Sequence, residues 1–288
     1  MRRIPMSFKT VSFKTVFLAI GVDQDDSALK RAIGVAQGFE AHLSVLVLGV
    51  AAPPPVSPYG VVSNDLWASE VDQGQLDVRA KAEAIEAVLA PSGISYSVEP
   101  QFVDSGTVTT LAARCARYAD LTLIAPRAAR AEQLQDWVMS GALFESGRPI
   151  LLLPETEFHF PRVDRVIIAW DASVEASKSV RDAIPILKSA AAVDAVLIDP
   201  VPTFEGHGQE PGADLAAYLG RHGIQPTVHR LPKQGQDVGG LLRQTAMDLG
   251  ADLIVMGGFG HSRLRQRFFG GTTTDMMKKL EIPVWMAH

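Results

Sequence analysis

The organisation of this chain can be inferred outward from one stretch, Gly257-Gly-Phe-Gly-His-Ser-Arg-Leu-Arg-Gln-Arg-Phe-Phe-Gly-Gly-Thr272. It follows an apolar run at 251–256, typical of a buried strand, and leads into 273–280, where we expect a helix. Glycine lets main-chain N–H groups approach a ligand closely, and a helix N-terminus adds unpaired N–H donors and the positive end of a dipole. Strand, glycine loop and helix start together predict a cradle for an anion such as a phosphate.

The glycine spacing, at 257, 260 and 270, separates this loop from two other phosphate-binding motifs. The dinucleotide fingerprint packs its glycines into six residues before a helix, and a Walker loop needs Gly-Lys-Ser/Thr, which does not occur in the chain. The alternative is a glycine-rich surface loop without a ligand, and the glycines alone leave it open.

The chain repeats itself, and a repeat fixes the architecture. Each half has an apolar strand ending in aspartate, a second apolar run, a strand preceded by Ala-Asp, and a short final strand after proline. The matched pairs are 17–23 with 165–171, 43–50 with 195–201, 118–125 with 250–257, and 149–153 with 283–287.

Amphipathic stretches follow the first strand of each half, with apolar residues on one helical face at 28–39 and 176–187. Strands that alternate with helices predict an α/β fold with a parallel sheet covered on both faces. The near-continuous apolar strand 166–170 agrees, because such strands are buried on both sides. We expect five strands and four helices in each half. The expected domains are 13–154 and 162–288, joined by a linker at 155–161 and preceded by a loose leader at 1–12.

These features resemble a tandem universal stress protein, with two copies of a UspA-like, Rossmann-like fold related to the adenine nucleotide alpha hydrolases. The resemblance covers almost the whole chain from about Lys14, and the glycine pattern is that of the family's phosphate-binding motif. It implies that ATP or another adenine nucleotide, with or without Mg²⁺, lies on this loop in a stress-response regulator. In the family, Ser or Thr usually follows the final glycine. Here Gly271 follows and Thr272 comes one place later, which leaves the hydroxyl contact open.

The resemblance also implies which residues form the site. The segment that holds the base corresponds to Ala169, Trp170 and Asp171, and a main-chain contact to adenine corresponds to Leu197. The phosphate segment corresponds to Met256, Gly257, Gly260, Gly270, Gly271 and Thr272. From its residue type, Asp171 could accept hydrogen bonds from a nucleotide or cap the following helix. Asp23 has the same place in the first half, so both interpretations stay open.

The two halves differ at the glycine loop. In the first half the corresponding segment, 125–141, contains no Gly-x-x-Gly and includes Pro126, which lacks an N–H. An insertion at 52–64 carries four prolines and predicts an extended surface loop. We therefore expect the first half to bind no nucleotide through this loop, or to bind it poorly.

Composition argues against other classes of protein. The net charge of −5 and pI near 5.8 disfavour a nucleic-acid-binding surface, and no apolar stretch approaches the roughly 20 residues of a membrane-spanning helix. The single cysteine, Cys115, excludes an internal disulfide framework and fits a reducing, cytoplasmic setting. An N-terminal apolar run at 16–22 faintly imitates a signal peptide, but acidic residues follow it and no cleavage site does.

Catalytic and metal-binding patterns are absent from the sequence. The seven histidines lack metal-ligand spacing, and Cys115 has apolar neighbours that favour packing over catalysis. The loop's basic residues could meet phosphate or form a solvated face; they are His261, Arg263, Arg265 and Arg267. Three hypotheses follow: a non-enzymatic nucleotide-binding regulator, a slow ATPase or adenylyl-transfer enzyme, and a ligand-free interaction protein with a decayed pocket.

The final strand of each half predicts how the halves assemble. An exposed apolar edge strand seeks a partner, so we expect 150–153 to pair with 284–286 about a pseudo-twofold axis. The family resembles this arrangement, since its single-domain members dimerise through the last strand. The result would be an internal pseudo-dimer, and any further homodimer would need another surface; protein partners are not identified by the sequence.

Overall fold

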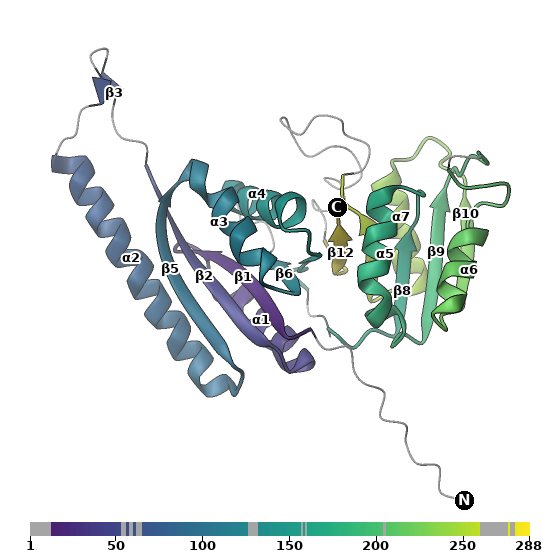
Figure 1. Ribbon diagram of the computed structural model, residues 1–288, viewed down its shortest axis with the longest axis horizontal. Coiled ribbons are helices and arrows are strands. Elements are labelled where there is room, and N and C mark those ends of the chain that lie inside the picture. The colour runs from purple at the N-terminus through teal and green to yellow at the C-terminus, as the bar shows by residue number, and fades with distance from the viewer. Residues whose placement is uncertain are drawn as a thin grey trace, which may run out of the picture.

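The computed structural model describes residues 13–52, 56–57, 60–61, 65–125, 132–156, 158, 160–203, 206–259, 276 and 280–288. The expected leader at 1–12 lies outside these residues. Helices and strands alternate along the chain and form layers around a central sheet (Figure 1).

The first half contributes five strands to the sheet: β1 (Thr15–Gly21), β2 (His42–Ala51), β5 (Tyr96–Asp104), β6 (Leu121–Ile124) and β7 (Ile150–Leu152). Its α-helices are α1 (Ser27–Phe39), α2 (Asp65–Leu89), α3 (Ser105–Arg117) and α4 (Glu132–Ser140). A 3₁₀ turn, η1 (Ala90–Ser92), extends α2, and a π-helical turn, η2 (Gly141–Glu145), extends α4.

The second half repeats this order with β8 (Arg165–Ala169), β9 (Ala192–Ile198), β10 (Pro226–Leu231), β11 (Leu253–Gly257) and β12 (Val284–Ala287). Its described helices are α5 (Val174–Leu187), α6 (Ala213–Arg221) and α7 (Val238–Leu249). The helix expected at 273–280 falls almost entirely outside the described residues.

Ten strands form one sheet in the order β10-β9-β8-β11-β12-β7-β6-β1-β2-β5. Within each half the strands pair in parallel, and each half has the sequential order third, second, first, fourth, fifth. The predicted α/β class and the five strands of each half are thereby confirmed.

Two expectations about individual segments need correction. The described part of the proline-rich insertion holds a two-stranded antiparallel pair, β3 (Val56–Ser57) with β4 (Gly60–Val61), where we expected only extended loop. The apolar run 195–201 places the end of the strand too late, because β9 ends at Ile198. Asp199 then adopts a φ of 44°, and Pro200 offers no N–H to continue the ladder.

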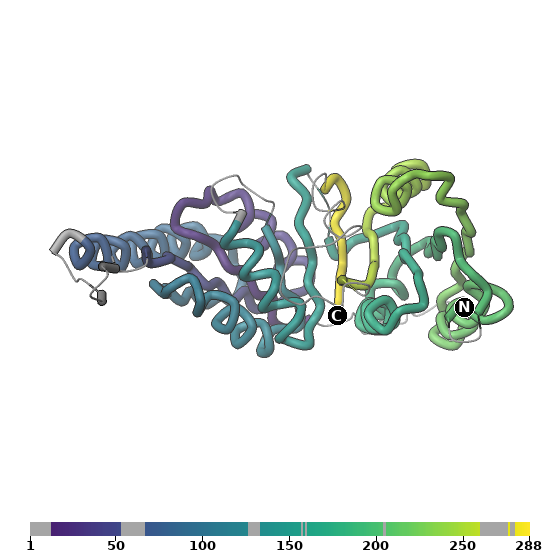
Figure 2. The backbone as a smooth tube through the Cα atoms, turned by 90° about the horizontal axis from the view of Figure 1, so that it is seen from above, coloured from purple at the N-terminus to yellow at the C-terminus, as the bar shows by residue number. Residues whose placement is uncertain are grey.

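The two halves join where β12 pairs antiparallel with β7, with Val284 opposite Leu152, Trp285 opposite Leu151 and Met286 opposite Ile150. Each of these side chains is at most 2% exposed. Figure 2 shows the last strand in the middle of the elongated molecule, between the two halves. This confirms the predicted pairing and the internal pseudo-dimer.

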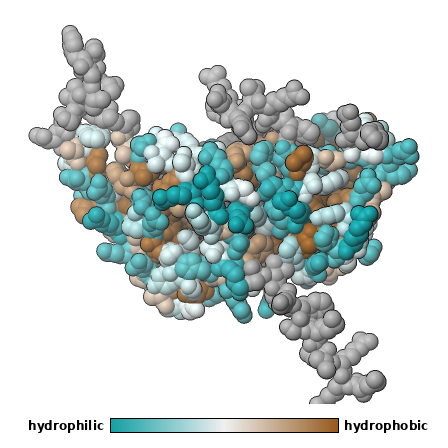
Figure 3. Space-filling model, in the orientation of Figure 1, coloured by the Kyte–Doolittle hydropathy of each residue, from teal (hydrophilic) through white to brown (hydrophobic). Residues whose placement is uncertain are grey.

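Both faces of the sheet are covered, and each hydrophobic core spans both halves. On one face, α1, α2, α5 and α6 bury their apolar sides against Trp285 and alternate strand residues. On the other face, α3, α4 and α7 pack around Val284 and Met286. Polar and apolar residues are interspersed over the surface view of Figure 3, and in the described residues no helix is both long enough and apolar enough to span a bilayer.

Substitution of Val284 by aspartate tests the joint. Val284 is fully buried in a cluster of apolar residues, so we expect a carboxylate in Val284→Asp to lower the free energy of unfolding by about 3 kcal/mol or more. The matched control is Val201→Asp, because Val201 is 63% exposed. Thermal and urea unfolding with sedimentation provide the measurement; an unchanged melting temperature in a stable Val284→Asp monomer would refute the internal pairing.

Candidate functional site

The carboxyl ends of β8 and β11 lie side by side, because these parallel strands are neighbours with Met256 opposite Ala169. In each half the strand order reverses at this position. Ligands of open α/β sheets bind in the crevice at such a switch point. The strand arrangement therefore brings Asp171 and Gly257 to the same edge of the sheet.

The turn after β8 is held by main-chain and side-chain hydrogen bonds. Trp170 N donates to Val196 O (2.9 Å), and Ser173 N donates to Asp171 Oδ1 (3.0 Å). Ala172 between them has a φ of 60°. The N-cap of α5 is Ser173, whose Oγ accepts from Ala176 N (3.1 Å). Asp171 therefore stabilises the turn, and the capping role proposed for it belongs to Ser173.

In the first half, the helix that follows the first strand begins at a different residue relative to the shared aspartate. The N-cap of α1 is Asp26, without a side-chain cap bond, and Asp23 lies three residues earlier. The aspartate shared by the two halves is therefore not a helix cap in either of them. Asp171 is exposed at the switch point, where its carboxylate can also meet a ligand.

Gly257 at the end of β11 lies against the first turn of α5. A Cβ built on it would be 2.6 Å from Ala176 N, a main-chain atom that cannot move aside cheaply. Only glycine lets the strand approach the helix start this closely. Gly257 therefore has a packing role in this structure, independent of any ligand.

Leu197 lies in β9 with its side chain fully buried. Main-chain groups along a strand face its two neighbours alternately. Val196 O accepts a hydrogen bond from Trp170 N at the end of β8, so the main-chain groups of Val196 face β8. Asp199 N donates to Leu231 O, so those of Asp199 face β10. By alternation, the main-chain groups of Leu197 also face β10. Those of Ile198 face the end of β8. Ile198 is thus the residue whose main chain faces the carboxyl end of β8, and the sequence pattern did not identify it.

The first half of the chain reaches the start of the glycine loop. The ring of Phe144, in η2, lies 5.5 Å from that of Phe259 and 4.8 Å from that of His288. His288 Nδ1 donates to Gly258 O (2.8 Å), and Gly258 N donates to Ala287 O (3.0 Å). Sequence analysis missed Phe144 and His288, because they become neighbours of the loop only through the β12–β7 pairing.

The remaining residues of the predicted phosphate segment lie outside the described residues. They are Gly260, Gly270, Gly271 and Thr272, together with the basic residues His261, Arg263, Arg265 and Arg267. Among the predicted site residues, the structure thus brings Ala169, Trp170, Asp171, Met256 and Gly257 to one edge of the sheet, with Leu197 buried in β9 beside them.

The first half has a cleft of about 550 Å³ at the equivalent position, above the ends of β1 and β2. No lysine or arginine is among the described residues that line it, whereas Asp23, Glu70 and Asp77 are. A Cβ on Gly21 would lie 2.7 Å from Leu134 Cδ2 of α4. The Leu134 side chain therefore packs against the end of the first strand. Three carboxylates and an apolar side chain disfavour phosphate in this cleft.

Groups that could carry chemistry are few in the described residues. Burial raises the pKa of the Cys115 thiol, and the nearby Glu99 charge adds to this effect. The thiol therefore stays protonated at neutral pH and is a poor nucleophile. No cluster of three or more His, Cys, Asp or Glu side chains able to hold a metal ion occurs among the described residues.

The chain is similar to known proteins in sequence over its second half and in fold over both halves. Residues 162–288 match the model of the Universal stress protein family. A universal stress protein from Archaeoglobus fulgidus DSM 4304 is similar over 96% of this chain and 97% of that chain, with a TM-score of 0.67 and 17% identity. A putative universal stress protein from Pseudomonas aeruginosa UCBPP-PA14 is similar over 95% and 92%, with a TM-score of 0.54 and 18% identity.

A functionally unknown protein from Pseudomonas aeruginosa PAO1 is also similar, over 95% of this chain and 92% of that chain, with a TM-score of 0.52 and 20% identity. At these identities the likeness concerns the fold, and it extends over both halves. No curated protein matches the chain significantly.

The role of Gly257 can be tested by adding one methyl group. We expect Gly257→Ala to lower the free energy of unfolding by about 2 kcal/mol, because the new Cβ forces β11 and α5 apart. Gly220→Ala in α6 is the control, since a Cβ there meets nothing within 4 Å and alanine favours the helix. Urea unfolding of both variants measures the difference; equal stabilities would show that the crevice tolerates the added side chain.

Proposed function

We propose that the protein is a stress-response regulator that binds an adenine nucleotide, ATP first among them, because residues 162–288 match the model of the Universal stress protein family. The nucleotide would occupy the crevice at the carboxyl ends of β8 and β11. The observation that carries the proposal is the adjacency of these two strands, which puts the Asp171 turn and the start of the glycine loop at one edge.

The described residues suggest how the base and ribose are held. The main-chain groups of Ile198 face the carboxyl end of β8 and would pair with the edge of adenine, while Leu197 lies buried next to Ile198 in β9. Trp170, whose N–H is bonded to Val196 O, fixes the end of β8 beside them. Asp171 can accept hydrogen bonds from the ribose hydroxyls or the adenine amino group, since a carboxylate is an acceptor only. Its bond with Ser173 N keeps this carboxylate in place.

The phosphates would lie on the loop that continues from Gly257. We propose contacts from Met256, Gly257, Gly260, Gly270, Gly271 and Thr272, with main-chain N–H groups as donors. Mg²⁺ would accompany the phosphates through their own oxygens, since magnesium is usually bound by substrate phosphates together with one or two carboxylates. The acidic cleft of the first half would remain without nucleotide.

These residues favour a regulatory activity in which a bound nucleotide changes the contacts between the two halves. The loop start touches Phe144 of the first half and the C-terminal His288, so a bound nucleotide would change contacts at the joint between the halves. A slow ATPase or adenylyl-transfer activity is the second candidate. A turnover assay with ATP and Mg²⁺ separates the two, because a regulator gives no ADP or AMP above the rate without protein.

Binding is tested on the full chain with two substitutions and a matched control. We expect Gly260→Val to abolish ATP binding, because a β-branched side chain blocks close main-chain approach, and Asp171→Asn to raise the Kd about tenfold. The control is Asp23→Asn, at the corresponding position of the first half, which should leave the Kd unchanged.

Titration calorimetry measures the Kd, and mass spectrometry identifies any nucleotide that leaves the protein on denaturation. Circular dichroism checks that each variant is folded. Equal losses in Asp171→Asn and Asp23→Asn would refute the assignment to the second half, and loss of helical signal in Gly260→Val would make that glycine structural.

A further inference from the structure

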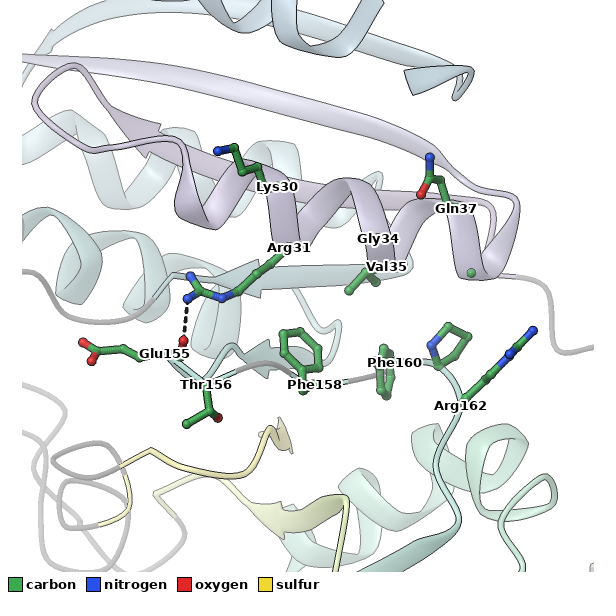
Figure 4. Close-up of a pocket in the computed structure, with 12 residues that line it drawn as sticks. Lys30, Arg31, Gly34, Val35, Gln37, Glu155, Thr156, Phe158, Phe160 and Arg162 are labelled. Atoms are coloured by element: carbon green, nitrogen blue, oxygen red, sulfur yellow. Dashed lines mark hydrogen bonds between the residues drawn. The ribbon is translucent and has the colours of Figure 1, made fainter. Parts of the chain in front are cut away.

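A second cleft, of about 510 Å³, lies between α1 and the segment that connects the two halves, away from the ends of β8 and β11. Figure 4 shows residues of α1 on one side and residues of the connecting segment on the other. This volume is within the range of about 300–1,000 Å³ found for small-molecule sites.

Two glycines one turn apart on α1 explain why the cleft exists. A Cβ on Gly38 would lie 2.2 Å from Pro161 Cδ, so this glycine lets the connecting segment pack directly on the helix. A Cβ on Gly34 would meet nothing within 4 Å. Glycine inside a helix costs about 1 kcal/mol relative to alanine, and packing does not require it at position 34. Its effect is to leave the space open.

The walls of the cleft are apolar and fixed. Val35 is 1% exposed and Phe160 6% exposed, and Phe158 is half-buried beside them. The ring of Phe160 packs edge-on against that of Phe39, with centroids 5.4 Å apart. A preformed apolar wall suits the hydrocarbon part of a ligand.

The charged residues at the cleft are mostly cations. Lys30, Arg31 and Arg162 line it, against the single described carboxylate Glu155, and none of the three cations forms an ion pair with a described residue. Arg31 Nη2 donates to the main-chain oxygen of Glu155 (2.7 Å), the contact drawn in Figure 4. Arg31 Nη1 is buried and has no hydrogen-bond partner in the described structure.

Arg31 lines the cleft, and an anionic acceptor there would form a strong, charge-assisted hydrogen bond with its guanidinium group. We propose that this cleft binds a small amphipathic carboxylic acid. Its carboxylate pairs with Arg31, and its apolar body lies over Gly34 against Val35, Phe158 and Phe160. The site is independent of the nucleotide site, and its ligand would contact both α1 and the connection between the halves.

The test uses the full chain and three ten-carbon probes, decanoate, decanol and decylamine, each below its micelle concentration. We expect decanoate to bind with one equivalent per chain, and decanol and decylamine to bind at least tenfold more weakly, because they lack the negative charge. Saturating ATP should leave the decanoate Kd unchanged. Titration calorimetry gives affinity and stoichiometry.

Substitutions separate this site from non-specific binding. Gly34→Leu fills the cleft, so decanoate binding should be lost while the melting temperature stays the same or rises, since leucine favours a helix. Gly220→Leu, at the other open helical glycine, should bind as the unmodified protein does. Arg31→Gln should weaken decanoate at least tenfold and leave decanol unchanged. Unchanged decanoate binding in Gly34→Leu, or equal affinity for the three probes, would overturn the proposal.

Discussion

Antiparallel pairing between β12 and β7 is the contact on which the rest of the structure depends. Without it each half would expose an apolar edge strand, which promotes association with other chains. The pairing merges two five-stranded sheets into one and lets each hydrophobic core continue across the joint. Trp285 is completely buried there, with Phe13 at 5.7 Å, and Phe13 in turn contacts Phe39. One row of aromatic rings thus ties the joint to α1.

The same joint brings the two halves to the candidate nucleotide site. His288 directly follows β12 and donates a hydrogen bond to Gly258 O at the start of the glycine loop. Phe144, in η2 of the first half, packs against His288. A ligand on this loop would therefore act on contacts made by both halves. The row of aromatic rings continues from Phe39 to Phe160, which lines the cleft beside α1. Both proposed sites therefore adjoin contacts that hold the halves together.

Sequence patterns predicted the features that depend on repetition and periodicity. The strand matches gave the sheet, its switch points and the β7–β12 pairing, because each is a property of whole apolar segments. Sequence patterns did not predict features that depend on where a single side-chain or main-chain group points. Ser173 rather than Asp171 caps α5, and the main-chain groups of Ile198 face the carboxyl end of β8. The cleft beside α1 joins residues about 120 positions apart, which no local pattern can signal.

The two halves share one strand order but place different side chains at the carboxyl ends of their first and fourth strands. At the fourth strand of the second half, Gly257 lets the main chain pass within contact of the α5 N-terminus, where N–H groups and the helix dipole favour an anion. In the first half, the Leu134 side chain of α4 lies against Gly21 at the end of the first strand, and carboxylates line the neighbouring cleft. Since the strand order is the same in both halves, the difference comes from the loops and helices that follow the strands. A chain with two such halves can keep one for a nucleotide and use the other to hold the shared sheet.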